Sequence, residues 1–358
     1  MSEPPTNDPQ RAASARPRER AEQPLCLITG ASGFIGGALA ARLTREGYAT
    51  RCLVRVGSDT SRLSRLDVQI VLGDLTDPSS LAEAVQGADH VLHCAALVSD
   101  WATKGEIRET NVLGTRSLLG AAAAASVERF VHLSTTDVYG YPNRPAVDES
   151  YSSTRFRNWY SQSKREAEAE VRRAEAEHGL RCVILRPATV YGPGSTEVVG
   201  EIARAIRARH MLLIGRGRAV AGLCYVENLV DAALLALGHD SASGEVFNVT
   251  DGLQVSWRRF TDDLAAGLDS PRVRFSLPLA LAGGLGFALE HGYRLLRAGT
   301  GLRIAPLLSR QAVQVLGENQ DFSNRKARQT LGWEPRVEYK AGLGATLAWL
   351  RSEYLQLD

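Results

Sequence analysis

Three glycines, each separated by two residues, follow a short apolar run near the start of the chain. Residues 25–29 read LCLIT, which is typical of a strand buried on both faces, and apolar residues return at helical spacing over residues 34–45. Gly30 permits a tight turn, Gly33 lets the backbone approach a phosphate, and Gly36 lets helix and strand pack closely. A strand, a glycine turn and a helix place a dinucleotide pyrophosphate on a helix N-terminus. The segment predicts a dinucleotide site, although a glycine-rich turn without a ligand has the same pattern.

Composition excludes several classes of protein. The chain has 358 residues, enough for a large core in one domain or in two joined domains. Its 42 basic and 40 acidic residues give a net charge of +2, so the charge balance does not indicate nucleic-acid binding. The longest apolar stretch, residues 277–289, is too short and too interrupted by glycine to span a bilayer. We also expect no bound metal.

Two further features of the sequence indicate the cellular compartment in which the protein is expected. The five cysteines have no C-x-x-C spacing, and each lies in or beside an expected strand: Cys26, Cys52, Cys94, Cys182 and Cys224. We interpret them as small buried hydrophobic residues in a reducing compartment. Residues 1–23 are rich in Pro, Arg, Ala and Glu without an apolar core, which predicts a disordered tail and not a signal peptide. We therefore expect a soluble, cytoplasmic protein.

Strand and helix patterns alternate along the first half of the chain. Further strands are expected at residues 50–56, 69–72, 90–94, 130–133 and 182–185, and helices at residues 78–86, 104–125 and 158–178. Such alternation predicts parallel β-α-β units with right-handed crossovers. The fold class is therefore α/β, a doubly wound parallel sheet, over residues 24–194, with ligands at the carboxyl ends of the strands.

Residues 195–358 have a less regular pattern. Helices are expected at residues 196–210, 228–237, 257–267, 279–297, 323–331 and 339–354, and short strands near Cys224 and Phe247. We interpret this half mainly as a smaller, mostly helical substrate-binding lobe, from which some segments return to the first domain.

Tyr160 and Lys164 lie one turn apart on the same face of an expected helix. An isolated phenol has a pKa of about 10 and is a poor acid–base group at neutral pH. A nearby ammonium lowers the pKa of the phenol, and the same ammonium can reach ribose hydroxyls. A tyrosine and a lysine four residues apart are common by chance. The position of this pair after the fifth strand is what favours a catalytic role.

Three hydroxyl residues, Ser134, Thr135 and Thr136, follow the fifth strand directly. One of these hydroxyls can hold a substrate carbonyl oxygen beside Tyr160. Three adjacent hydroxyls are also typical of a turn or a helix cap. The residues alone leave both interpretations open.

Seven motifs occur in the order found in the extended short-chain dehydrogenase/reductase family, part of the NAD-dependent epimerase/dehydratase superfamily. They are TGASGFIG (29–36), GDL (73–75), HCAA (93–96), NVLGT (111–115), LSTTDVYG (133–140), YSQSK (160–164) and LRPATVYGPG (185–194). The chain resembles this family over residues 25–350. The resemblance implies a Rossmann domain, an NAD or NADP cofactor, and a catalytic set of Thr135, Tyr160 and Lys164, with threonine in place of the more common serine.

The resemblance also implies which residues bind the cofactor: Gly30, Ser32, Gly33, Phe34, Ile35, Gly36, Arg55, Asp74, Leu75, Ala95, Ala96, Tyr160, Lys164, Pro187 and Val190. An acidic residue at the end of the second strand binds the ribose 2′-hydroxyl of NAD, whereas an arginine accommodates the 2′-phosphate of NADP. Val54 occupies the acidic position and Arg55 follows it. Arg51, Arg62 and Arg65 lie nearby in the sequence. This favours NADP(H) over NAD(H), with a solvated arginine as the alternative.

Residues 221–228, AGLCYVEN, distinguish branches of the family. Sugar-nucleotide epimerases and dehydratases have an arginine here that binds the substrate phosphates. Ala221 and Gly222 stand in this region, and they cannot form a bidentate phosphate clamp; Arg216 and Arg218 are the candidates for a displaced one. YVEN and residues 305–335 instead resemble the 3β-hydroxysteroid dehydrogenase and sterol-4-carboxylate dehydrogenase branch, to which a bacterial group that reduces long-chain 2-alkyl-3-ketoacids is related.

These features predict an NAD(P)(H)-dependent oxidoreductase. It transfers a hydride between the nicotinamide and a ketone or secondary alcohol of a hydrophobic substrate (steroid-, isoprenoid-, polyketide- or long-chain-like), with Tyr160 as acid/base. A sugar-nucleotide epimerase/dehydratase and a non-catalytic dinucleotide-sensing protein are the alternatives, and the intact catalytic set argues against the latter.

The apolar segment of residues 277–308 fits a substrate wall, a peripheral membrane contact or an ordinary amphipathic lid helix. The predicted partners are a hydrophobic small molecule and a second copy in a homodimer. We expect a cleft lined largely by apolar side chains.

Overall fold

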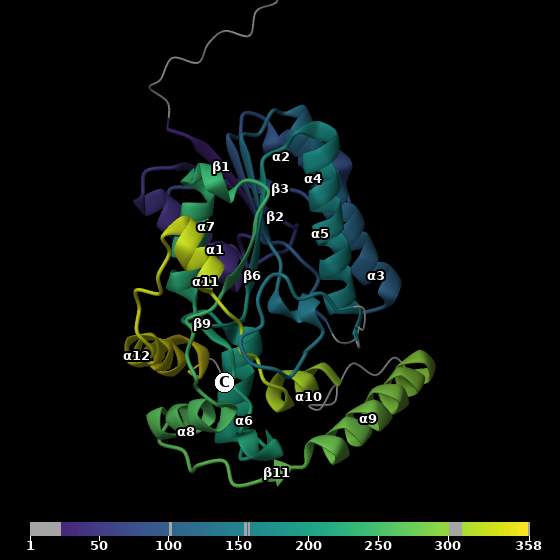
Figure 1. Cartoon of the computed structure of the whole chain (residues 1–358), viewed down its shortest axis with the longest axis vertical. Helices are drawn as coiled ribbons and strands as arrows, with labels where there is room; N and C mark the ends of the chain where they lie inside the picture. Colours follow the sequence, from purple (N-terminus) through teal and green to yellow (C-terminus); the bar gives the residue numbers. More distant parts are fainter. Residues whose placement is uncertain (1–22, 100–101, 154–155, 157, 301–309, 357–358) are drawn as a thin grey trace, which may run out of the picture.

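The computed structural model describes residues 23–99, 102–153, 156, 158–300 and 310–356 (Figure 1). Among these residues the main sheet has seven parallel strands in the order β10-β6-β5-β4-β1-β2-β3. The strands are β1 (Leu25–Thr29), β2 (Ala49–Val54), β3 (Gln69–Leu72), β4 (His90–His93), β5 (Arg129–Leu133), β6 (Cys182–Pro187) and β10 (Val246–Val249). This is the doubly wound parallel sheet that the sequence predicts, with β10 added from the second half of the chain.

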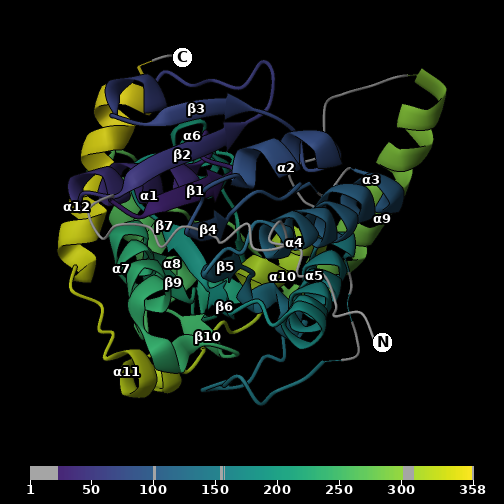
Figure 2. The ribbon, with the colours of Figure 1, turned by 90° about the horizontal axis from the view of Figure 1, so that it is seen from above.

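Helices cover both faces of the sheet (Figure 2). One face carries α1 (Phe34–Arg45), α7 (Val226–Gly238) and α11 (Arg325–Leu331), and the other carries α2 (Pro78–Val85), α4 (Thr115–Ala124) and α5 (Trp159–His178). Leu43 of α1 and Leu229 of α7 are fully buried in one apolar core with Ile28 of β1. The core of the dinucleotide-binding domain therefore includes helices from the second half of the chain.

The other elements form a second lobe. Its strands are β7 (Thr189–Tyr191), paired with β9 (Leu223–Tyr225), and β8 (Leu213–Ile214), paired with β11 (Ser276–Leu277); its helices are α6 (Glu201–Arg207), α8 (Trp257–Gly267), α9 (Leu279–Thr300), α10 (Arg310–Gly317) and α12 (Tyr339–Trp349). Tyr191, Trp257 and Phe260 are fully buried in its core. In Figures 1 and 2, α9 projects away from the rest of the molecule.

The single helix expected over residues 104–125 is divided. α3 (Lys104–Arg108) passes through a π-helix (Glu109–Gly114) into α4. The side chain of Asn111, within the π-helix, accepts from the amide of Leu97 (2.6 Å) and donates to its carbonyl oxygen (3.1 Å). The irregular turn thus fixes the segment that follows β4.

Other boundaries differ by smaller amounts. Two more π-helices, Thr196–Gly200 and Leu350–Tyr354, replace parts of expected α-helices, and α10 was not expected; short 3-10 turns occupy Leu63–Arg65, Thr136–Tyr139, Gly215–Gly217 and Asp240–Ala242. The predicted tail falls outside the described residues, apart from its last position. No described helix is long and apolar enough to cross a membrane.

Candidate active site

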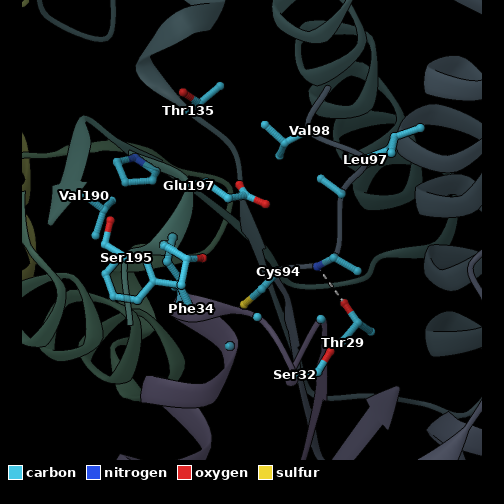
Figure 3. Close-up of a pocket in the computed structure, with 18 of the residues that line it drawn as sticks. Thr29, Ser32, Phe34, Cys94, Leu97, Val98, Thr135, Val190, Ser195 and Glu197 are labelled. Carbon is cyan, nitrogen blue, oxygen red and sulfur yellow. Dashed lines mark hydrogen bonds between the residues drawn. The ribbon is translucent and has the colours of Figure 1, made fainter. Parts of the chain in front are cut away.

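A cavity of about 820 Å³ opens at the carboxyl ends of β1, β2, β4, β5 and β6 (Figure 3). The catalytic candidates Thr135 and Tyr160 line it. All the predicted cofactor-binding residues except Lys164 also line it: Gly30, Ser32, Gly33, Phe34, Ile35, Gly36, Arg55, Asp74, Leu75, Ala95, Ala96, Tyr160, Pro187 and Val190. The structure therefore brings residues from across the sequence to one place.

The turn after β1 has the shape that a pyrophosphate requires. Gly30 has a φ of +70°, and a Cβ on it would lie 2.8 Å from the amide nitrogen of Ala95. A Cβ on Gly36 would overlap the carbonyl oxygen of Gly30. No side chain caps the N-terminus of α1, whose first-turn residues line the cavity. Since first-turn amides lack intrahelical partners, they fit a bound dinucleotide phosphate.

Buried hydrogen bonds join β1 to β4 beside this turn. His93 places Nδ1 2.7 Å from Oγ1 of Thr29 and Nε2 2.8 Å from Oγ1 of Thr115. Thr115 donates its own proton to the Asn111 carbonyl oxygen, so Nε2 donates to Thr115 and Thr29 donates to Nδ1. Burial lowers the pKa of His93 to about 3, which keeps the ring neutral. Oγ1 of Thr29 also accepts from the amide of Ala95 (3.2 Å; Figure 3).

Thr135 has one of the two roles that the sequence left open for the hydroxyls after β5 and leaves the other possible. Its Oγ1 accepts from the amide of Asp137 (3.1 Å) and so caps the short helix Thr136–Tyr139. The Thr135 O–H can still donate to a carbonyl oxygen in the cavity. Ser134 instead donates to Oε1 of Glu168 (2.6 Å), and Thr136 is buried. Thr135 is therefore the hydroxyl best placed for a substrate.

The Tyr160 phenol stays protonated near neutral pH. Burial raises the pKa of Tyr160 above its usual value, and the carboxylates of Asp137 and Glu197 raise it further. The prediction that the pKa of Tyr160 is lowered is therefore wrong for this arrangement. Burial disfavours the charged phenolate, and the Lys164 ammonium donates to the carbonyl oxygen of Leu133 instead.

Lys164 lies one turn after Tyr160 on α5 and does not line the cavity. Its Nζ donates to the carbonyl oxygen of Leu133 at the end of β5 (2.6 Å). Burial lowers the pKa of Lys164 to about 8, and the carboxylate of Glu168 partly opposes this. The predicted contact with ribose hydroxyls remains a prediction.

A buried ion pair supports this end of the cavity through Glu168, which accepts from the cavity-lining Ser134. Arg186 on β6 donates two hydrogen bonds to Glu168 (2.8 and 2.7 Å) and one to the hydroxyl of Tyr139 (2.9 Å). The Tyr139 hydroxyl donates in turn to Asn248 on β10 (2.6 Å). All four side chains are buried, so a change in one leaves another without its partner.

The arginines around β2 have different positions. Arg55 and Arg62 are exposed and line the cavity, as does Asp59. Arg51 does not line it, because its guanidinium donates to Gln69 and to carbonyl oxygens at the end of α2. Arg65 does not line it either. Two of the four arginines therefore line the cavity.

Ala221 and Gly222, which stand where sugar-nucleotide enzymes have a phosphate clamp, do not face the cavity. Ala221 is fully buried in the core of the second lobe and does not line the cavity. Gly222 has a φ of +61°, and a Cβ on it would lie 2.6 Å from the carbonyl oxygen of Gln320. Gln320 lines the cavity, whereas Arg216 and Arg218, the candidates for a displaced clamp, do not.

Sequence reasoning missed several cavity residues. They include Thr29, Leu53, Ser58, Asp59, Cys94, Leu97, Val98, Thr110, Asp137, Glu197, Gln311, Val315 and Gln320. Four of the five cysteines are buried as expected, but Cys94 is half-buried and lines the cavity. The Glu197 side chain lies toward the middle of the cavity in Figure 3. A signal existed for Asp137 and Glu197, which lie beside LSTT and YGPG, and also for α10, whose apolar residues recur at helical spacing.

The chain was compared with protein families and known proteins. The profile of the NAD dependent epimerase/dehydratase family matches residues 26–250. A 4-hydroxy-2-methyl-3-oxo-4-farnesyl-3,4-dihydroquinoline-1-oxide ketoreductase from Stigmatella aurantiaca is 34% identical over 322 residues, covering 89% of this chain and 94% of the relative. A 3-beta-hydroxysteroid dehydrogenase from Mycolicibacterium neoaurum is 31% identical, covering 86% of each chain.

A solved structure has the same fold. The UDP-glucose 4-epimerase from Thermotoga maritima, crystallised with UDP-glucose, superposes with a TM-score of 0.75 at 22% identity. The match covers 93% of this chain and 100% of the epimerase. The likeness extends over both lobes.

Proposed function

The chain belongs to the NAD dependent epimerase/dehydratase family and is an NAD(P)-dependent oxidoreductase of the extended short-chain type; we propose that it reduces the ketone of a hydrophobic, uncharged substrate. The observation that carries the proposal is the cavity itself. It joins a dinucleotide cradle to the Thr135–Tyr160 pair, and its described lining has cations only at Arg55 and Arg62.

Proton transfer in this mechanism is the task of Tyr160. The bound nicotinamide supplies the hydride. Thr135 donates a hydrogen bond to the ketone oxygen and orients it toward the phenol. Tyr160 gives its proton to that oxygen as the carbonyl carbon is reduced. A phenol whose pKa is raised is protonated at neutral pH, so Tyr160 has the proton that this step requires.

Charge near Tyr160 supports an uncharged substrate. Asp137 and Glu197 both line the cavity and both raise the pKa of Tyr160. A carboxylate or diphosphate bound nearby would be repelled by them. The described lining of the cavity has a neutral amide at Gln320 and no cation besides Arg55 and Arg62, so it offers no arginine clamp for a second diphosphate. These side chains argue against both a 2-alkyl-3-ketoacid and a sugar nucleotide.

Apolar contacts support a hydrophobic substrate. Leu97, Val98 and Val315 line the cavity together with Phe34 and Val190 (Figure 3). The two relatives act, by their names, on a farnesylated quinoline oxide and on a 3β-hydroxysteroid. We propose a ring ketone with an apolar body, and NADPH as the reductant because Arg55 and Arg62 follow β2.

The test compares a 2-alkyl-3-oxo acid with its methyl ester. The two molecules share a chain and a ketone and differ by one charge, so their relative kcat/KM values for NADPH oxidation report charge selection. We expect the ester to be at least about tenfold better, and Glu197→Gln to reduce that ratio about threefold at low salt. Glu201→Gln is the matched control, since Glu201 is exposed and does not line the cavity.

If the oxo acid has a higher kcat/KM than its methyl ester, the proposal of an uncharged substrate is refuted. Turnover of UDP-glucose by the same protein would refute the ketoreductase itself. If the ester is preferred but Glu197→Gln leaves the ratio unchanged, the charge selection does not come from Glu197.

A further inference from the structure

The outward face of α9 is apolar, whereas a helix face in contact with water is usually polar. Leu281 and Phe287 have exposed fractions of 58% and 52%, and Leu285 is also exposed. Ala282 and Gly286 are buried instead. The small residues therefore face the protein and the large apolar ones face away from it.

The packing of α9 holds these side chains outward. Ala282 packs against Ile214 of β8 and Val313 of α10 in a separate apolar cluster. Leu279, at the start of the helix, lies against Gly317 at the end of α10. The base of the helix is thus attached to the second lobe, while its length extends away from the body (Figures 1 and 2).

The charged residues that precede this surface in the sequence are basic. From Phe275 to Leu289 the sequence has no charged residue. Arg272 and Arg274 directly precede it and are exposed. Exposed Arg216 is fixed to the same strand, since its amide donates to the hydroxyl of Ser276 (2.8 Å). An apolar surface beside three arginines has the charge pattern that anionic lipid head groups attract.

We propose that this region docks on the surface of an anionic lipid bilayer. The α9 apolar surface consists of Phe275, Leu279, Leu281, Leu285, Phe287 and Leu289. Arg272 and Arg274 contact the head groups while the apolar side chains enter the boundary with the acyl chains.

Two features favour lipid over a second copy of the chain. At ~100° per residue, Leu281, Leu285, Phe287 and Leu289 together span about half the helix circumference, whereas a protein groove covers a narrower stripe. In a two-fold dimer through this surface, the arginines of both copies would be brought together. Lipid surrounds a helix more widely and supplies the opposite charge.

The surface lies one helix away from the cavity. α10 packs against α9 and contributes Gln311 and Val315 to the cavity lining. Under the proposed function, an apolar ketone dissolved in the bilayer would reach the cavity along α10. Lipid binding itself does not depend on that function, so the two can fail separately.

The experiment is flotation of the full chain with vesicles. We expect binding to vesicles of equal phosphatidylcholine and phosphatidylglycerol, and much weaker binding to phosphatidylcholine alone. Leu281→Gln with Phe287→Gln should weaken binding at least about tenfold. Ile70→Gln with Leu72→Gln is the matched control, because both residues are exposed on β3. Arg272→Gln with Arg274→Gln should weaken binding to the anionic vesicles about fivefold per arginine.

NADPH binding and thermal unfolding report whether each variant is folded. If the α9 variant does not fold, the arginine variant still tests the proposal because it leaves the apolar side chains in place. No binding of the wild-type chain to anionic vesicles would refute the proposal. A dimer seen by light scattering that the α9 variant abolishes would show that a second copy covers this surface instead.

Discussion

The two ends of the cavity hold their functional groups in different ways. Around Tyr160 the groups are buried and paired: Lys164 donates to Leu133, and Arg186 is bound to Glu168. Around β2, Arg55 and Arg62 are exposed on a loop. Proton transfer requires a fixed position and a fixed pKa, which burial and pairing provide. Distinguishing two cofactors requires only charge within reach, so exposed side chains suffice.

The largest effect is expected at the buried end. Tyr160→Phe keeps the ring and removes the proton that reaches the ketone oxygen. The rate of ketone reduction should fall about 10²–10⁴-fold, while NADPH affinity changes little. Steady-state kinetics and cofactor titration measure the two quantities. A variant that keeps more than about a tenth of the rate would mean that another group supplies the proton, and the contrast between the two ends would fail.

A selective effect is expected at the exposed end. Arg55→Ala should weaken NADPH binding about 10–150-fold, because a charge-assisted hydrogen bond to the 2′-phosphate is lost, and should leave NADH binding unchanged. Arg65→Ala is the control, since Arg65 does not line the cavity. Fluorescence titration with both cofactors gives the comparison. Equal losses for the two cofactors, or no loss, would show that Arg55 is only a surface residue.

The smallest expected effect is a pH dependence that tests whether burial lowers the pKa of Lys164. Because the pKa of Lys164 is lowered to about 8, its ammonium is lost as the pH rises above that value. The predicted contact of Lys164 with the ribose hydroxyls requires the ammonium, so the rate at limiting NADPH should be constant well below pH 8 and about tenfold lower one unit above it. Lys164→Arg, if folded, should keep its charge and remove this decline.

The free energy of unfolding should rise above pH 8, whereas the rate should fall. Between pH 8 and the higher pKa of an unfolded lysine, the unfolded chain binds more protons than the folded one. The free energy of unfolding should therefore rise with pH in the wild type relative to Lys164→Met. A wild-type rate that stays constant to pH 10 would place the pKa of Lys164 near its ordinary value.

The sequence predicted the sheet and the buried end well because each depends on local pattern. Gly30 and Gly36 are required by close backbone contacts, and such contacts leave a readable glycine spacing. Tyr160 and Lys164 are related by one helical turn. In contrast, the partner of Lys164 is a main-chain carbonyl at Leu133, which has no residue signature.

The substrate end was predicted less well because its residues come from distant segments. Gln311 and Val315 lie on α10, which is amphipathic but only eight residues long, and a helical pattern does not show that these two side chains reach the cavity. The sequence shows that position 221 has no arginine, but only the fold shows that the Ala221 side chain enters the lobe core. Arg51 lies near Arg55 in the sequence, but its hydrogen bonds to the end of α2 hold it away from the cavity.

The pairing of β10 with β6 has a consequence for synthesis of the protein. A ribosome must translate through residue 249 before the outer edge of β6 can be covered, since Val246 to Val249 pair with Ile184 to Pro187. Until then β6 presents unpaired backbone groups that another chain can bind. The hydroxyl of Tyr139 also lacks its acceptor until Asn248 has been translated. A nascent chain that has emerged only to residue 194 is therefore an unfinished sheet, which is exposed to aggregation until much of the second lobe has been made.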